Sequence, residues 1–349
     1  MSTNDRQAAA RELRAAYRRL IQRRITIMLT GAGLLALSFV VDLATGPSFL
    51  ALDRVFMTLL GQSDDRSIET IVWAIRVPIA IMAVLVGASL GTTGLLMQSI
   101  LNNPLASSYT LGIAAGAGFG AALMILSGEN GDYTVPFGAF VFSALACLIV
   151  WGIGRLRGMT PEILVLAGIA VLFLFQALLA FLQFIASQEA LQMIVFWLFG
   201  SLQKATPSKN ALIAVALVSV ALFLWRDLWG LSALRLGDER ARALGVQTEA
   251  LRVRAFISIA VLTGAAVAFA GTIGFIGIIA PHIARMMVGE DHRVLWPLSA
   301  IVGALILSLA SITSKMILPG TIIPIGIVTA LIGVPFFIWL IMTHRRSHW

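Results

Sequence analysis

Long stretches without a charged residue constrain this chain more than any other feature. Each is at least about as long as the roughly 20 residues that a helix needs to cross the hydrocarbon core of a bilayer. The first is long enough for two crossings. The stretches are 77–128, 133–154, 163–188, 255–281 and 294–314. We therefore predict an all-α integral membrane protein, because only helices and closed barrels satisfy their backbone hydrogen bonds in lipid.

The composition supports a membrane location. Only 12% of the 349 residues are charged and 59% are hydrophobic, whereas soluble domains are about 25% charged. The net charge of +8 would suggest nucleic acid as a partner of a soluble protein. Here the distribution of basic residues across a membrane explains the charge better, and we predict no nucleic-acid partner.

Hydropathy and charge breaks predict about ten membrane helices. The eighth is too short to span the bilayer alone, and the apolar stretch 190–203 predicts a further partial or re-entrant helix. The ten lie near residues 25–45, 77–98, 108–127, 134–154, 162–186, 209–226, 255–277, 279–289, 296–317 and 323–342.

The basic residues predict the orientation. With the N-terminus inside, the cytoplasmic segments hold 19 of the 25 Lys and Arg, seven of them within residues 1–24. Acidic residues divide almost evenly, nine inside and eight outside. By the positive-inside rule both termini are cytoplasmic. We predict a cytoplasmic N-terminal helix over 1–24, a transmembrane domain over 25–342 and a cytoplasmic tail over 343–349.

Residues for catalysis or ion coupling are scarce. Ion-coupled carriers bury acidic or histidine side chains at membrane depth, and the predicted spans hold almost none, so a secondary carrier is a distant alternative. A membrane-embedded enzyme or a metal site at His282 and His292 would need more ligands than this patch offers. No lysine follows a glycine as a Walker A loop requires. We expect no cofactor in this chain; if it transports actively, a partner ATPase must bind ATP and Mg²⁺.

The longest cytoplasmic connection, about 227–254, contains a short amphipathic helix that Gly245 ends. An apolar side formed by Ala241 and Leu244 favours docking of that ATPase, although a solvated loop is the simpler interpretation. The residues predicted to couple to it are Leu236, Gly237, Asp238, Glu239, Ala241, Leu244, Gly245 and Val246.

Residues 271–293 carry the most specific pattern. A glycine-punctuated apolar helix, 271–280, runs into a charged patch whose characteristic residues are Pro281, His282, Arg285, Asp291, His292 and Arg293. The pattern resembles the permease subunits of ABC importers for ferric siderophores, haem and cobalamin. The resemblance runs from about residue 70 to 342 through ordered motifs that include 73–78, 87–90, 103–106, 166–168, 236–246, 324–326 and 333–337.

This resemblance implies a type II importer of two permease chains, two ATPase subunits and an extracytoplasmic binding protein, in a bacterial inner membrane. By likeness, Asn103 and Leu105 form the cytoplasmic gate, although a purely structural helix break would look the same. Arg76 and Lys315 match positions that receive the binding protein, although Arg76 could merely extend to the interface.

The chain also departs from the family at the outer face, where Ile79, Ser311 and Ile322 replace charged residues. A binding protein with weaker acidic anchors or a second, different permease chain would each explain this. We expect an iron chelate, a ferric siderophore, as the cargo, with haem or cobalamin as the alternative. Walls without charge suit a bulky chelate better than a bare ion, which needs ligating oxygens.

Overall fold

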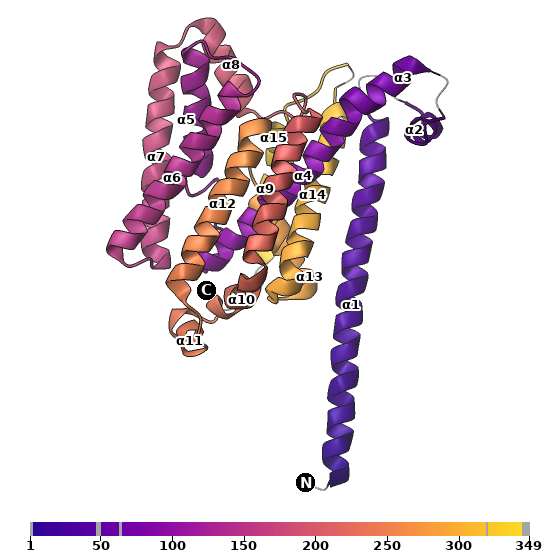
Figure 1. Ribbon diagram of the computed structural model, residues 1–349, viewed down its shortest axis with the longest axis vertical. Coiled ribbons are helices and arrows are strands. Elements are labelled where there is room, and N and C mark those ends of the chain that lie inside the picture. The colour runs from indigo at the N-terminus through magenta and orange to yellow at the C-terminus, as the bar shows by residue number, and fades with distance from the viewer. Residues whose placement is uncertain (1–2, 47–49, 63–64, 319, 344–349) are drawn as a thin grey trace.

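The computed structural model describes residues 3–46, 50–62, 65–318 and 320–343, and within them all regular structure is helical (Figure 1). The elements are α1 (Thr3–Ala44), α2 (Leu52–Leu59), α3 (Arg66–Thr70), η1 (Ile71–Arg76), α4 (Val77–Ile100), α5 (Ile113–Leu126), α6 (Thr134–Arg157), α7 (Pro161–Ile185), α8 (Gln188–Leu198), α9 (Pro207–Leu224), η2 (Trp225–Asp227), α10 (Leu228–Leu234), α11 (Asp238–Ala243), α12 (Thr248–Ala270), α13 (Ile276–Val288), α14 (His292–Met316) and α15 (Ile325–Thr343).

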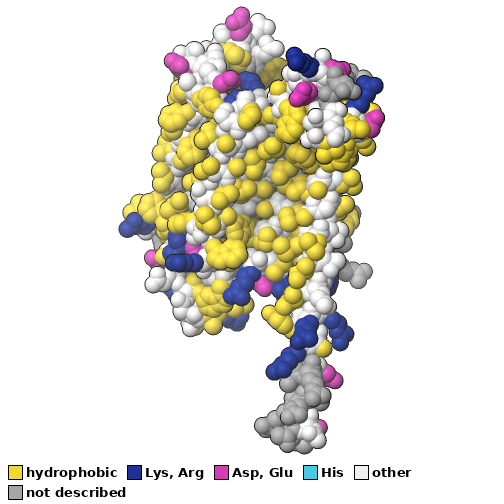
Figure 2. Space-filling model, turned by 45° about the vertical axis from the view of Figure 1, so that its right-hand side comes forward, with side chains coloured by type: hydrophobic (Ala, Val, Ile, Leu, Met, Phe, Trp, Pro, Cys, Tyr) yellow, Lys and Arg dark blue, Asp and Glu magenta, His cyan; other side chains and the backbone are white. Residues whose placement is uncertain are grey.

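The predicted all-α membrane fold is confirmed. Within the described residues, seven helices are long and apolar enough to cross a bilayer, and three shorter apolar helices, α5, α13 and α15, complete a set that corresponds to the ten predicted segments. Many large apolar side chains are exposed, and Phe184 and Leu222 are examples. Hydrophobic side chains form a continuous belt across the face shown in Figure 2, and charged side chains gather at its two ends. A belt of this size on an isolated chain is a lipid-facing surface.

The N-terminal region is helical throughout: α1 is one uninterrupted helix of 42 residues that joins the predicted N-terminal helix to the first span. Neither proline nor glycine interrupts it before Gly31, so nothing in its backbone forces a break. The basic part of α1 projects beyond the bundle at one end (Figure 1). The predicted tail, 343–349, lies outside the described residues except for its first residue.

Helix α4 is the central element, buried along most of its length. Glycines allow its neighbours to approach closely, as small residues commonly do between membrane helices. A Cβ on Gly91 would lie 2.3 Å from the carbonyl oxygen of Ser299 on α14, and one on Gly94 would lie 1.9 Å from that of Gly277 on α13. Larger side chains at these positions would force the helices apart.

The predicted helices 255–277 and 271–280 are wrong over residues 271–275. Helix α12 ends at Ala270, and the next residues form an extended link to α13. Gly271 has φ +74° and Phe275 has φ +68°, which are incompatible with an α-helix. The carbonyl of Ala270 accepts a hydrogen bond from the amide of Ser201 (2.8 Å) instead of continuing the helix. The predicted start of the third helix at residue 108 is also displaced, because α5 begins at Ile113.

Two ends of the bundle matter for function (Figure 1). One contains α10 and α11, and the basic part of α1 extends beyond it; we call it the α11 end. The other contains α2, α3 and α8, and we call it the α8 end. The stretch predicted as a partial helix at 190–203 forms α8 at this second end, followed by a loop.

Candidate functional site

The predicted coupling segment folds at the α11 end as expected. Gly237 (φ +93°) precedes α11 and Gly245 (φ +85°) follows it, so a left-handed residue bounds the helix on each side. Ala241 is fully buried, whereas Leu236 and Leu244 are 53% and 52% exposed. The apolar side is therefore divided: Ala241 anchors the helix to the bundle and the two leucines are presented outward.

The predicted gate residues lie in a tight turn directly after α4. Asn102 has φ +46°, and the side-chain oxygen of Asn103 accepts a hydrogen bond from the amide of Leu105 (2.9 Å). This local bond replaces the helical pattern and lets Pro104 follow, as asparagine does in many turns. Asn103 and Leu105 are both half-buried.

Two of the signature residues, Arg285 and His292, connect elements at this end. Arg285 donates to Glu290 (3.1 Å) and to the side chain of Gln98 on α4 (3.0 Å). His292 Nε2 lies 2.7 Å from Ser99 Oγ on α4, and its Nδ1 lies 3.1 Å from Ser232 Oγ on α10.

The remaining signature residues have other surroundings. Asp291 pairs with Arg24 of α1 (3.0 Å) and caps α14 through the amide of Arg293. Pro281 and His282 are buried, and the ring of His282 meets that of Phe336 edge-on at 6.5 Å. Arg293 itself is exposed. The signature is thus mainly a set of contacts that ties α13 and α14 to their neighbours.

Sequence reasoning missed Arg252, the largest fully buried side chain of the described residues. On α12, it forms two hydrogen bonds of 2.7 Å to Asp238 and a third, of 3.3 Å, to the carbonyl of Ile100. The last turn of α4 is therefore held by three helices. Arg285 of α13 binds Gln98, His292 of α14 binds Ser99, and Arg252 of α12 binds Ile100. The sequence signal that could have identified Arg252 is the position of an arginine close to the start of an otherwise apolar span.

The predicted docking residues at the α8 end are engaged inside the chain. Lys315 is 8% exposed and pairs with Asp42 of α1 at 2.7 Å, while Arg76 is 5% exposed and donates to the carbonyls of Leu43 and Ala44. Their role in docking stays a prediction, but this structure presents neither group on the surface. The expectation of spans almost free of ionisable groups overlooked Asp42, which is fully buried and also accepts from Ser311 (3.0 Å).

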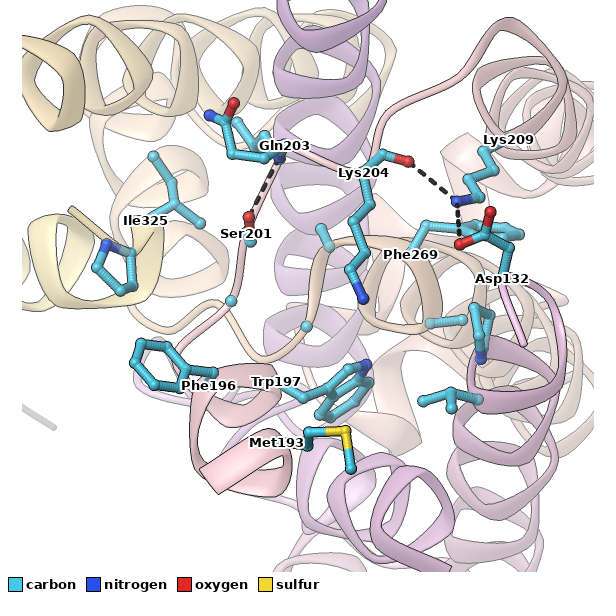
Figure 3. A pocket seen from close by; sticks show the side chains of 18 of the residues that line it. Asp132, Met193, Phe196, Trp197, Ser201, Gln203, Lys204, Lys209, Phe269 and Ile325 are labelled. Carbon is cyan, nitrogen blue, oxygen red and sulfur yellow. Dashed lines mark hydrogen bonds and ion pairs between the residues drawn. The ribbon is translucent and has the colours of Figure 1, made fainter. Parts of the chain in front are cut away.

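A cavity of about 510 Å³ also lies at the α8 end, between α8, the loop after it and the ends of α12 and α14. Phe196, Trp197 and Phe269 give it aromatic walls (Figure 3). The ammonium of Lys209 is paired with Asp132 (3.7 Å) and the carbonyl of Lys204 (3.0 Å). No described residue pairs with the ammonium of Lys204, which points toward Trp197 (Figure 3).

One positive charge in the cavity lining has no counter-charge, because Asp132 is the only acid there. Among the described residues, no group of three or more His, Cys, Asp or Glu is placed to hold a metal ion. The cavity therefore suits a bulky aromatic or apolar molecule that carries negative charge, and its lining offers no ligand set for a bare metal cation.

Comparison with known proteins identifies the class. A solved structure described as an inward-facing conformation of a metal-chelate type ABC transporter superposes with a TM-score of 0.83 and 30% identity, covering 91% of this chain and 99% of that one. The chain thus has the fold of an ABC transporter permease, a membrane subunit that is not catalytic.

The chain belongs to the FecCD transport family, whose model matches residues 34–343. The Fe(3+)-citrate import permease YfmE of Bacillus subtilis is 34% identical over 93% of this chain and 96% of its own length. The hemin transport permease HmuU of Yersinia pestis is also 34% identical, over 89% of this chain and 95% of its own. The resemblance stated from the motifs is therefore confirmed, and the chain is a permease of a type II importer for iron chelates, haem or vitamin B12. Family membership implies ATPase partners and a permease dimer.

Proposed function

We propose that this chain forms half of the membrane path of a bacterial ferric-siderophore importer in the cytoplasmic membrane. The α11 end faces the cytoplasm in this proposal. The asymmetry of basic residues supports that orientation, since 19 of the 25 Lys and Arg fall in the segments assigned to the inside.

The ATPase would seat on the outward-facing leucines of the α11 end, Leu236 and Leu244. Two half-exposed leucines among charged side chains are typical of a small apolar contact with a polar rim. The turn containing Asn103 and Leu105 would close the path on the same side. Both features lie at the end where nucleotide is available, which supports joining them in one mechanism.

An extracytoplasmic binding protein would deliver the cargo at the α8 end. Because Arg76 and Lys315 are buried, its acidic groups would meet exposed cations of this end first. Arg54 on α2, Arg66 on α3 and Lys204 are the exposed examples among the described residues. The importer needs a second permease chain. A chain of different sequence would supply the surface arginines that this chain lacks, whereas an identical chain would not.

The chemistry of the cavity supports an anionic chelate as the cargo, a class that includes ferric siderophores and hemin. Relatives are named for ferric citrate, hemin and vitamin B12. A 510 Å³ cavity with aromatic walls and one unpaired ammonium fits a preassembled anionic chelate, because aromatic surface and a single cation recognise its apolar body and its charge.

Uptake by a strain lacking this gene, complemented with the wild-type chain, tests the proposal. We expect restored uptake of ⁵⁵Fe supplied as an anionic tricatecholate chelate, with hemin and cobalamin uptake unchanged. Restoration of hemin or cobalamin uptake alone would overturn the siderophore assignment while leaving the importer class intact.

The substitution Lys204→Glu should lower the initial rate of tricatecholate uptake by about two- to fivefold, the range expected for one partly exposed ionic contact. The rate for a cationic trihydroxamate chelate, if it is carried, should not fall. Gln203→Glu serves as the matched control, because it adds the same negative charge one residue away without removing the ammonium. Equal effects of the two substitutions would show that Lys204 has no specific role.

A further inference from the structure

Arg252 joins two parts of the molecule that the proposed function treats separately. Its guanidinium binds both oxygens of Asp238, the first residue of α11, at 2.7 Å. The same group donates through Nε to the carbonyl of Ile100, the last residue of α4. One rigid, buried side chain therefore contacts the coupling segment and the helix that ends at the gate turn.

Both contacts are placed where they resist separation. The last carbonyls of a helix have no partner within it, and a cation at this end is favoured by the helix dipole. Asp238 lies at the positive end of α11 for the same reason. The Arg252 side chain is 2% exposed and that of Asp238 is 32% exposed, so breaking the pair would leave a buried guanidinium without its counter-charge.

The path from this pair to the gate is short. Ile100 is followed by Leu101 and then by Asn102, whose positive φ opens the turn that holds Asn103. A displacement of α11 that carries Asp238 with it must either break a buried charged pair or move Arg252 and the end of α4. Arginine is suited to this because its planar fork fixes the direction of every bond.

We propose that Arg252 is a positioning residue that transmits the movement of α11 to the gate turn, so that ATP hydrolysis and opening of the path stay coupled. This inference rests on the proposed function, in which α11 meets the ATPase. It predicts that weakening the Arg252 contacts leaves hydrolysis running while transport falls.

The neighbouring pair of Arg254 and Asp227 offers a matched control. It lies on the same helix two residues further on, and it has the same two bonds of 2.7 Å. Its acidic partner belongs to η2, ahead of α10, instead of α11. Arg254→Lys therefore makes the same chemical change to a bidentate pair of this helix without loosening α11 from α4.

The test uses the complete importer, with its ATPase and binding protein, reconstituted in proteoliposomes and supplied with the ⁵⁵Fe-tricatecholate chelate. ATP hydrolysis and uptake are measured in the same sample. Arg252→Lys should keep ATPase subunits bound and hydrolysis within about twofold of wild type, while the ATP consumed per chelate imported rises tenfold or more. Arg254→Lys should leave this ratio within about twofold.

An unchanged ratio in Arg252→Lys, or equal changes in the two arginine variants, would overturn the proposal. If Arg252→Lys does not fold, Asp238→Glu decides: it keeps the charge but shifts the carboxylate, and it should raise the ratio severalfold. A normal ratio in Asp238→Glu would then refute the role of this contact. Failure of the wild-type complex to couple ATP to uptake would instead refute the proposed function.

Discussion

Replacing Gly94 by alanine should prevent most of this protein from reaching its folded state. The new Cβ would lie 1.9 Å from the carbonyl oxygen of Gly277 and 2.5 Å from its carbonyl carbon and its Cα. All three are backbone atoms, so no side chain can rotate away, and α4 and α13 must separate. We expect a cost at the upper end of the range for overpacking, about 3 kcal/mol or more.

Gly152→Ala on α6 is the matched control, because a Cβ there has no neighbour within 4 Å. Alanine is the better helix former, so this variant should be unchanged or slightly more stable. Thermal stability in mild detergent, followed by size-exclusion chromatography, separates the two. Similar melting temperatures for both variants would show that the close approach of α4 and α13 is absent in the folded protein.

Breaking the buried pair of Asp42 and Lys315 should be the second large effect. The side chains are 0% and 5% exposed, so Asp42→Asn leaves an ammonium buried near Arg76 without its counter-charge. Removing one partner of such a pair costs about 3–5 kcal/mol. The double variant Asp42→Asn with Lys315→Met should recover much of this loss, because no uncompensated charge remains at the pair.

The comparison with an exposed pair makes the measurement specific. Arg24 and Asp291 are 22% and 40% exposed, and Arg24→Gln should cost no more than about 1 kcal/mol. Unfolding of each variant in detergent gives the comparison. If Lys315→Met kept full stability and only weakened binding-protein docking, Lys315 would be a surface anchor and its burial in this structure would be wrong.

The membrane helices could be predicted from sequence because bilayer thickness fixes their length and charges mark their ends. The break between α12 and α13 could not. Residues 271–275 are as apolar as their neighbours, and a polar partner comes from far earlier in the chain: the hydroxyl of Thr272 donates to the carbonyl of Leu198, the last residue of α8. Only the fold brings these segments together.

The candidate site was predictable in part for related reasons. The glycines around α11 and the Asn-Pro turn are local signals, and the structure places both as expected. The link through Arg252 is not local, since Asp238 is 14 residues away and Ile100 is 152 residues away. Asp42 near the end of a span is typical of an interfacial residue, and its burial depends on Lys315 from a distant helix.

Co-purification of the tagged chain with its partners tests the central claim most directly. Mass spectrometry after mild-detergent extraction should find an ATPase with the wild-type chain, with Leu156→Asp as the control. Leu156 is 85% exposed on the last turn of α6. Leu244→Asp should reduce the recovered ATPase by about tenfold or more, as loss of an apolar anchor worth 1.4 kcal/mol would. An ATPase absent from the wild-type preparation, or retained in full by Leu244→Asp, would contradict this account.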